Sequence, residues 1–466
     1  MSKNKKSNKK RTVSDSMGKI NIPHNAMYGA QTQRAINNFP ISDLRFTPDF
    51  IYSVVVIKRS GAIVNYKLKL LNKVKKEAIV KACDEILLGK YNNQFPLDVY
   101  QTGSGTSTNM NVNEVVANIA NSFIKSNSDK VHPNDHVNLG QSSNDVIPSS
   151  IHISALSMVL KELLPALIDL EKSLLKKEKE FKKIIKIGRT HLQDATPMTL
   201  GQEFSGYREL IRKNIKRIKN DISFINVLTL GGTAVGTGIN THRDFGKKIA
   251  EEISRFTKIK FIKTKNHFES QSSQDSIVGF SGSLKTLAVG LSKIANDIRW
   301  LASGPRSGLG ELIIPSLQPG SSIMPGKVNP VICESMLQVC AQVIANDSGI
   351  TIGGLGSVLE LNMMLPMIAN NSLNSIKILS SSINIFNKNL IKNIKPNSEK
   401  CENYIEGSLA MCTALVPLIG YDEAAQIAYE AYNTNKTIKE VLQQKNLFSD
   451  EEIENILDPR TMLKPK

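Results

Sequence analysis

The sequence lacks the residue spacings that indicate a disulfide framework or a metal centre. Its five cysteines are scattered along 466 residues, odd in number, and none forms a C-x-x-C pair. This pattern argues against disulfides and against a zinc site, and it favours a reducing compartment. The seven histidines show no H-E-x-x-H spacing either. We therefore expect no bound metal ion.

Aromatic residues and long apolar runs are also scarce. Aromatics make up 6% of a chain that is 41% hydrophobic, which favours helix-on-helix packing over β-sandwiches. No run approaches the roughly 18 apolar residues of a membrane-spanning helix. The basic residues 1–11 lack the apolar segment of a secretory signal, so we expect them to form a disordered tail. These absences predict a cytoplasmic protein that does not enter a membrane.

Acidic residues are too few to balance 59 lysines and arginines, which leaves a formal net charge of +17. Such a balance can reflect nucleic acid, an anionic membrane surface or acidic substrates as partners. Lysine is spread along the whole chain, however, and no zinc-finger, RNP or basic-zipper pattern is present. We expect a solvated lysine-rich surface. Nucleic-acid binding by residues 1–11 is the alternative, and it predicts salt-sensitive binding that disappears without the tail.

Helical periodicity accounts for most of the chain, and one pattern is unusually long. From Pro148 to about Lys183 a near-continuous apolar stripe exceeds a typical globular helix, which favours a large bundle or an oligomer core. Neither a βα alternation nor an internal repeat is visible. Other helical patterns cover residues 49–88, 201–228, 270–302, 331–347 and 362–393, and a short strand is expected at 19–22.

The composition changes after Pro396, where the helical segments become short. Thr437 with Glu440, and Ser449 with Glu452, have the spacing of capping boxes. We therefore expect a small separate domain at the C-terminus. After the tail, the expected domains are 12–141, a central domain at 142–396, and 397–466.

Polar, glycine-containing islands interrupt the helices, and their side chains suit a small dianionic carboxylate. Hydroxyls, amides and backbone N–H groups near helix starts are suitable anion ligands. Paired acids for Mg²⁺-dependent phosphoryl transfer, a dinucleotide fingerprint and a phosphate-binding loop are all missing. The plainer alternatives are connecting loops and helix caps, and for His191 a merely structural role. The islands lie at 101–111, 131–145, 188–195 and 319–330.

Taken in order, the islands resemble the fumarase/aspartase superfamily, and within it the class II fumarate hydratases. The resemblance extends from DSMG at 15–18 to GYDEAAQIA at 420–428. It implies a mainly α, three-domain fumarase/aspartase-like fold with a central bundle of long helices. The matching motifs are TGSGTSTNMNVNEV (102–115), HPNDHVNLGQSSNDV (132–146), GRTHLQDATPMTLGQE (188–203) and the signature GSSIMPGKVNP (320–330).

The resemblance also implies a reaction and an assembly. Water adds reversibly and anti to fumarate, giving L-malate, with neither metal nor cofactor. The implied assembly is a homotetramer whose active sites each draw on three subunits. Removal of a proton alpha to a carboxylate leaves two negative charges on one carboxyl group, and preorganised donors would stabilise that aci-carboxylate.

The match to the family implies catalytic roles for five residues. Ser321 would be the base, which backbone N–H groups and nearby cations must activate, and its loop can close over the substrate. His191 would act on the opposite face through a water, held by Glu334, and Lys327 and Asn329 would stabilise the aci-carboxylate. The implied substrate-binding positions are Ser104, Thr106, Ser142, Ser143, Asn144, Thr190 and Ser322, with Asn109 and Gln141 in support; a second anion site is matched by His132, Asn134 and Asp135.

Two other readings compete with a fumarate hydratase. Aspartase shares most of these residues, but the Thr102-Gly103-Ser104 run, Gly326 and Pro319 favour fumarase. A non-enzymatic helical relative would be signalled by loss of Ser321, His191 or Lys327, and all three are present. The chain departs from the family's usual N-terminal entry at Val13 and in its basic tail, away from the matched catalytic positions.

Overall fold

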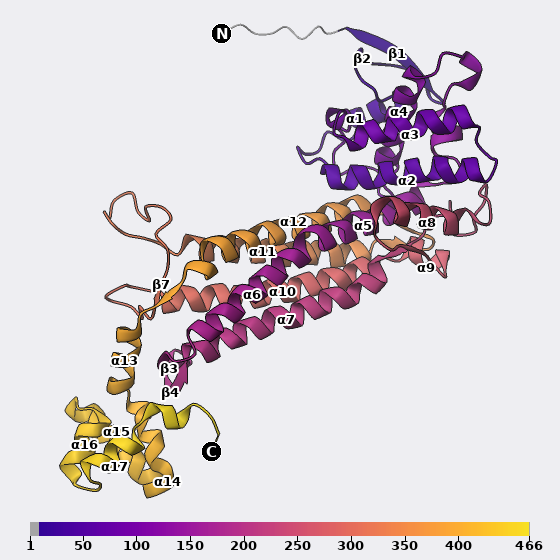
Figure 1. Cartoon of the computed structure of the whole chain (residues 1–466). Coiled ribbons are helices and arrows are strands. Elements are labelled where there is room, and N and C mark those ends of the chain that lie inside the picture. Colours follow the sequence, from indigo (N-terminus) through magenta and orange to yellow (C-terminus); the bar gives the residue numbers. More distant parts are fainter. Residues whose placement is uncertain (1–8, 466) are drawn as a thin grey trace. The chain divides into compact units, whose positions relative to one another are not determined.

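The computed structural model describes residues 9–465, and they form a mainly helical protein, as the sequence predicts (Figure 1). The chain divides into two compact units. The division into domains at 12–141, 142–396 and 397–466 stays a prediction. Of the described residues, unit 1 takes those up to Leu164 with Lys216–Thr286 and Gln342–Leu379, and unit 2 takes Pro165–Ile215, Leu287–Ala341 and the residues from Ser380 onward.

Unit 1 consists mainly of helices, with a short β-hairpin at its start and further two-residue strands between the helices. Four long helices, α7, α10, α11 and α12, contribute residues to both units. The elements of unit 1 are β1 (Lys10–Asp15), β2 (Gly18–Pro23), α1 (Ala30–Asn38), α2 (Pro48–Lys67), α3 (Lys73–Leu87), α4 (Thr106–Ser122), α5 (Ser143–Met158), β5 (Val227–Leu228), α8 (Phe245–Thr257), β6 (Ile262–Lys263), α9 (His267–Ser272), β8 (Ser357–Val358) and β9 (Leu361–Asn362).

Unit 2 combines further long helices with a small C-terminal cluster. The elements of unit 2, with the four shared helices, are α6 (Leu164–Glu180), β3 (Ile185–Thr190), β4 (Gln193–Thr199), α7 (Leu200–Ile225), α10 (Asp275–Leu301), β7 (Leu312–Ile313), α11 (Val331–Gly354), α12 (Leu365–Asn389), β10 (Lys395–Pro396), α13 (Ser398–Gly407), α14 (Val416–Ile419), α15 (Tyr421–Thr434), α16 (Ile438–Lys445) and α17 (Asp450–Ile456).

The N-terminal hairpin corrects one expectation. The strand expected at 19–22 is confirmed within β2, but its partner β1 begins at Lys10, inside the segment expected to be a disordered tail. Arg11 pairs with Ile22, and its guanidinium donates to the carbonyl of Ala26 at 2.8 Å. A two-stranded ribbon buries little, so a charged sequence can form it without an apolar pattern. The rest of the expected tail, residues 1–8, lies outside the described residues.

The long helical pattern is confirmed as one continuous helix, Ser143–Glu180, of 38 residues. It comprises α5, a π-helical turn at Val159–Leu163 and α6. Contrary to expectation, this helix is long and apolar enough to cross a membrane by length and composition. Of its apolar window, 61% is buried inside the protein, however, which is typical of a core helix. It is the one such helix among residues 9–465.

The start of α1 depends on a side chain from another helix. Gly29, its N-cap, provides no side-chain cap. Instead the buried Glu114 of α4 accepts hydrogen bonds from the backbone N–H groups of Gly29, Gln31 and Thr32 and from the Thr32 hydroxyl, at 2.6–3.1 Å. An unpaired helix start costs free energy because its donors have no other partner. Glu114 therefore fixes α1 against α4.

Replacing Glu114 with alanine should destabilise unit 1. The change leaves the two buried donors of Thr32 and the part-buried N–H groups of Gly29 and Gln31 without Glu114, and we expect the free energy of unfolding to fall by about 3 kcal/mol. Denaturant unfolding followed by circular dichroism measures this. Glu77→Ala on α3, an exposed acid, is the matched control and should change little. An unfolding midpoint for Glu114→Ala equal to that of the control would contradict the capping role.

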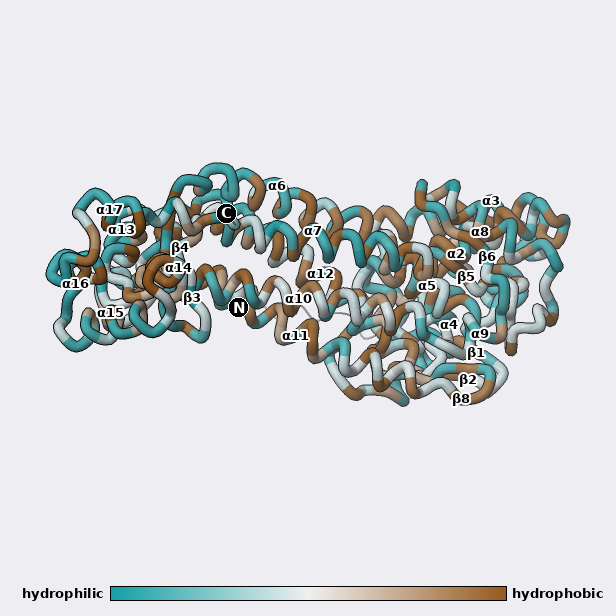
Figure 2. The backbone as a smooth tube through the Cα atoms, turned by 90° about the horizontal axis from the view of Figure 1, so that it is seen from below, coloured by the Kyte–Doolittle hydropathy of each residue, from teal (hydrophilic) through white to brown (hydrophobic). Residues whose placement is uncertain are grey.

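In unit 2 the packing follows the alternation of apolar and polar residues along each helix, visible as brown and teal stretches on α6 and α7 (Figure 2). Phe204 of α7 packs edge-on against Phe181, with ring centroids 5.1 Å apart. The C-terminal cluster has its own core, which includes Ile427, Val441 and Ile453. Both expected capping boxes are confirmed, at the starts of α16 and α17.

Candidate active site

In unit 1 the structure brings two of the polar islands together through their hydroxyls. Ser104 Oγ lies 2.8 Å from Thr106 Oγ1, which in turn lies 2.7 Å from Ser143 Oγ. Thr106 is the first residue of α4 and Ser143 the first of α5, so the chain of hydroxyls joins two helix starts. Backbone N–H groups at helix starts favour anions. This arrangement suits the carboxylate of a small substrate.

Ser142, Asn144 and the buried Asp145 order the start of α5. The Ser142 hydroxyl accepts from the Asn144 N–H, and Asp145 accepts from the Ser142 N–H, which completes a capping box. Asp145 Oδ2 also accepts from the N–H groups of Gly231 and Thr233, at 3.1 and 3.0 Å. Burial raises the pKa of Asp145 to about 6, although these backbone bonds and Lys58 oppose it. Asp145, which the sequence did not single out, therefore supports the predicted side chains.

The raised pKa of Asp145 predicts a pH dependence of stability. A carboxyl whose pKa rises from 3.8 to about 6 on folding stabilises the folded state below pH 3.8, and this contribution is lost as pH rises through about 6. From pH 7 to pH 5 the wild type should therefore gain about 1 kcal/mol relative to Asp145→Asn. Denaturant unfolding at both pH values measures the difference. Asp43→Asn, at an exposed acid, is the control; a parallel pH profile for Asp145→Asn and wild type would refute the shift.

In unit 2 the signature loop holds three predicted residues close together. Gly320 N–H donates to the Lys327 carbonyl at 2.7 Å, and Asn329 Nδ2 donates to the Gly320 carbonyl at 2.8 Å. A Cβ at Gly320 would meet the Asn329 nitrogen at 2.7 Å, so only glycine allows this closure. Ser321 Oγ accepts from the N–H groups of Ile323 and Met324, at 3.2 and 2.9 Å. The loop thus aims two backbone donors at the predicted base.

His191 lies at the tip of the β3–β4 hairpin. His191 and Leu192 form its two-residue turn, with φ of 55° and 61°. Such turns favour Gly, Asn or Asp, because a side chain is strained at positive φ. Strained residues at exposed turns are concentrated at functional sites. Thr190 precedes the turn, and both Thr190 and His191 are exposed.

Buried charges hold the base of this hairpin. Lys186 of β3 lies 3.3 Å from both Glu203 and Glu311, and Arg189 lies 2.8 Å from Glu311. Glu311 is fully buried and Lys186 is 2% exposed. Burial raises the pKa of Glu203, while Lys186 opposes the shift. None of these residues was singled out in the sequence, although Arg189 stands directly before Thr190.

Other predicted residues are less closely connected. Glu334 lies in the first turn of α11 and is half-buried; among the residues described, no hydrogen bond joins it to His191. Ser322 is exposed in the signature loop. His132 and Asp135 meet at the Pro133–Val137 turn, with His132 Nδ1 3.2 Å from the carboxylate, and both are exposed. An anion bound at His132 would therefore face a neighbouring negative charge.

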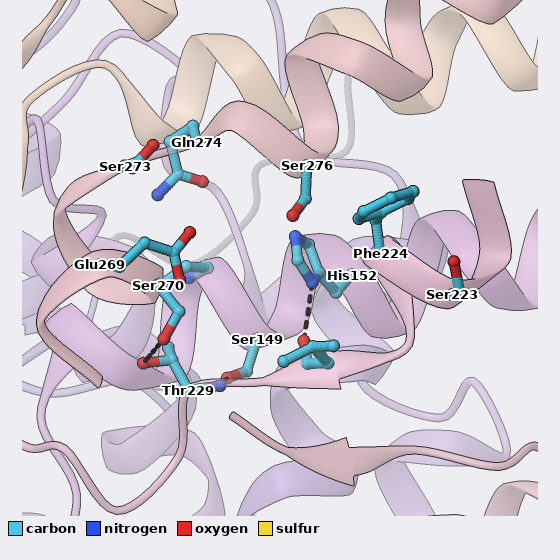
Figure 3. Close-up of a pocket in the computed structure, with 12 residues that line it drawn as sticks. Ser149, His152, Ser223, Phe224, Thr229, Glu269, Ser270, Ser273, Gln274 and Ser276 are labelled. Carbon is cyan, nitrogen blue, oxygen red and sulfur yellow. Dashed lines mark hydrogen bonds between the residues drawn. The ribbon is translucent and has the colours of Figure 1, made fainter. Parts of the chain in front are cut away.

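A separate pocket of about 190 Å³ in unit 1 contains none of the predicted residues. Figure 3 shows His152 between Ser149 and Ser276. His152 Nδ1 lies 2.7 Å from the Val227 carbonyl, and burial lowers the pKa of this histidine. The side chains that we expect to bind the substrate therefore do not line this pocket. Among residues 9–465, no three His, Cys, Asp or Glu side chains converge as a metal site, and all five cysteines are free.

Comparison with known proteins identifies the family. A family model described as Lyase matches residues 18–345, and one described as Fumarase C C-terminus matches residues 411–464. The chain is 50% identical over 456 residues to "Fumarate hydratase class II" of Wigglesworthia glossinidia brevipalpis, covering 97% of this chain and 98% of that protein. The protein of the same name from Helicobacter pylori is 47% identical over 455 residues, with the same coverage.

Solved structures agree with these relatives. The crystal structure of a recombinant class II fumarase from Schistosoma mansoni superposes with a TM-score of 0.95 at 39% identity, covering 97% of this chain and 99% of that one. A fumarate lyase:delta crystallin from Brucella melitensis bound to cobalt gives 0.93 at 42% identity, covering 98% and 100%. The chain therefore belongs to the class II fumarate hydratase family, lyases that reversibly hydrate fumarate to malate.

Proposed function

We propose that Ser321 is the base that removes the alpha proton of L-malate in the dehydration direction, and that the two loops of unit 2 carry the proton transfers. The observation that supports this most directly is the pair of hydrogen bonds that Ser321 Oγ accepts from the backbone N–H groups of Ile323 and Met324. A serine hydroxyl is a weak base, and donors aimed at its oxygen lower the cost of the alkoxide.

The reaction proceeds through an aci-carboxylate. In the dehydration direction, Ser321 removes the proton alpha to one carboxylate of L-malate, and the electron pair moves into that carboxyl group. Lys327 and Asn329 are held beside Ser321 by the loop closure. They donate hydrogen bonds to this carboxyl group, which now carries two negative charges. His191, through a water, protonates the leaving hydroxyl on the opposite face, and fumarate and water result. Glu334 holds the His191 ring. No step requires a metal ion or a cofactor.

The remaining predicted residues bind the substrate. Ser104, Thr106 and Ser143 present hydroxyls, and the starts of α4 and α5 present N–H groups, to the second carboxylate of fumarate or L-malate. Thr190, Ser142, Asn144 and Ser322 complete the contacts. The exposed set His132, Asn134 and Asp135 is the proposed second anion site.

Anti addition provides the test of this chemistry. Hydration of fumarate in D₂O should give L-malate with one deuterium at the methylene carbon and a single diastereomer, because base and acid act on opposite faces. Proton NMR of the product distinguishes the two diastereomers by their vicinal coupling. A mixture of diastereomers would contradict two fixed groups on opposite faces.

The proposed assembly is a homotetramer in which each site draws on three subunits. Large apolar side chains that lie exposed on unit 1 support it: Phe224 is 60%, Ile352 60% and Leu355 79% exposed. Solvent contact of so many large apolar groups is unfavourable, and an oligomer interface would cover them. Mixing Ser321→Ala with Thr106→Val, each nearly inactive alone, should restore activity after subunit exchange.

We propose a cytoplasmic location, with neither membrane nor nucleic acid as a partner.

A further inference from the structure

Lys58 of α2 lies at the centre of a buried polar network in unit 1. Its side chain is fully buried. Its Nζ donates to Asn109 Oδ1 at 2.7 Å, to Asn138 Oδ1 at 2.9 Å and to Gln141 Oε1 at 3.0 Å. A buried ammonium is tolerated only when its donors are paired. Three acceptors use all three of its hydrogens, so the network is complementary to the charged form.

Lys58 also determines which way the three amides point. An ammonium donates and cannot accept, so each amide must turn its oxygen toward Lys58 and its NH₂ group elsewhere. Accordingly, Asn109 Nδ2 donates to Asn138 Oδ1 at 3.2 Å, and Asn138 Nδ2 donates to the Gln141 carbonyl at 3.0 Å. Gln141 Nε2 donates to the Val137 carbonyl at 3.2 Å. The network thus links α2, α4 and the loop before α5.

Two members of the network adjoin the proposed substrate-binding hydroxyls. Asn109 lies one turn after Thr106 on α4, and its N–H donates to the Gly105 carbonyl at 3.0 Å. Gln141 stands directly before Ser142, the N-cap of α5. A shift of either amide would therefore move a helix start that carries substrate contacts.

Burial and the neighbouring charges act on Lys58 in opposite directions, and the shape of α2 fits the network. Burial lowers the pKa of Lys58 to about 7, while the carboxylate of Asp145 and the thiol of Cys83 oppose the shift. Gly61, also on α2, makes room for the amide, because a Cβ there would lie 2.9 Å from Gln141 Nε2. The helix α2 thus provides both the cation and the space that Gln141 occupies.

We propose that Lys58 is a positioning residue for substrate binding, which acts through Asn109 and Gln141 to set the positions of the Thr106 and Ser143 hydroxyls. This inference rests on the function proposed above. Proton transfer is assigned to Ser321 and His191, which belong to other islands. Loss of Lys58 should therefore weaken binding of the dicarboxylate more than it slows the chemical steps.

Steady-state kinetics of Lys58→Met with L-malate tests the proposal. Methionine fills most of the space but leaves three amide oxygens without a donor, and we expect KM to rise about 10-fold or more while kcat changes less than about 3-fold. Lys67→Met is the matched control: Lys67 lies on the same helix, is half exposed, and pairs with Glu252. It should leave both constants unchanged. A folded Lys58→Met variant with the KM of the wild type, or with loss confined to kcat, overturns the proposal.

Two further measurements keep the proposal testable under other outcomes. Hydrogen exchange followed by mass spectrometry should show faster exchange in residues 102–111 and 138–146 of Lys58→Met, but not of Lys67→Met, and this readout needs no activity. If the wild type were inactive but the exchange pattern were as expected, the proposed function would be wrong and the positioning role would be supported. Unchanged exchange in Lys58→Met would contradict the positioning role. If Lys58→Met does not fold, Asn138→Leu removes one acceptor and should raise KM in the same direction; an unchanged KM would count against the network.

Discussion

Replacing Ser321 with alanine should lower kcat by about 10²–10⁴-fold, the usual contribution of a general base. The hydroxyl that accepts the alpha proton is lost, while the backbone of the signature loop keeps its closure through Gly320, Lys327 and Asn329. KM should change little, because the substrate hydroxyls of unit 1 remain. Stopped-flow or steady-state absorbance of fumarate measures the rate.

The matched control for this substitution is Ser316→Ala. Ser316 is exposed and stands five residues earlier in the same connecting segment, and its loss should leave kcat unchanged. Gel filtration of both variants checks that assembly is unaffected. If Ser321→Ala turned over L-malate at a near-normal rate, another group would be the base.

Replacing Lys327 with methionine should lower kcat by about 10²–10³-fold, as expected when a donor to developing negative charge is removed. The charge on the aci-carboxylate is larger in the transition state than in bound malate, so kcat and kcat/KM should fall together. Lys327→Arg should restore only part of the rate, because the guanidinium fork is larger and differently shaped than an ammonium.

Lys388→Met provides the control for Lys327→Met. Lys388 is an exposed lysine in the last turn of α12, and its removal changes the net charge equally. It should leave the rate unaffected at moderate salt. A loss of similar size in both variants would mean that overall charge steering of the dianion, and not a local donor, explains the effect.

The sequence predicted the helical elements well because their periodicity is strong. The helices over 201–228, 270–302 and 331–347 correspond to α7, α9 with α10, and α11. The hairpin partner β1 was missed because a solvated two-stranded ribbon leaves no apolar pattern. Local signals thus identify elements that bury a face, and they fail for elements that do not.

The supporting side chains of the site could not be predicted, for a different reason. Ser321, Lys327 and Asn329 are near neighbours in sequence, so their motif was visible. Lys58 meets Asn109 and Gln141 only after α2, α4 and the loop before α5 have folded together, and Glu311 meets Lys186 across more than a hundred residues. The available signal was a lysine inside the apolar run IYSVVVIKRSG. Long-range convergence of buried polar groups has no local pattern to reveal it.

The most direct test of the central claim is a substrate comparison. The purified full chain, treated with a chelator of divalent metals, is offered L-malate and L-aspartate separately while the ultraviolet absorbance of fumarate is followed. Rapid formation of fumarate from L-malate alone is the expected result, and it would support metal-independent hydration chemistry. Formation from L-aspartate alone, or from neither substrate, would contradict it.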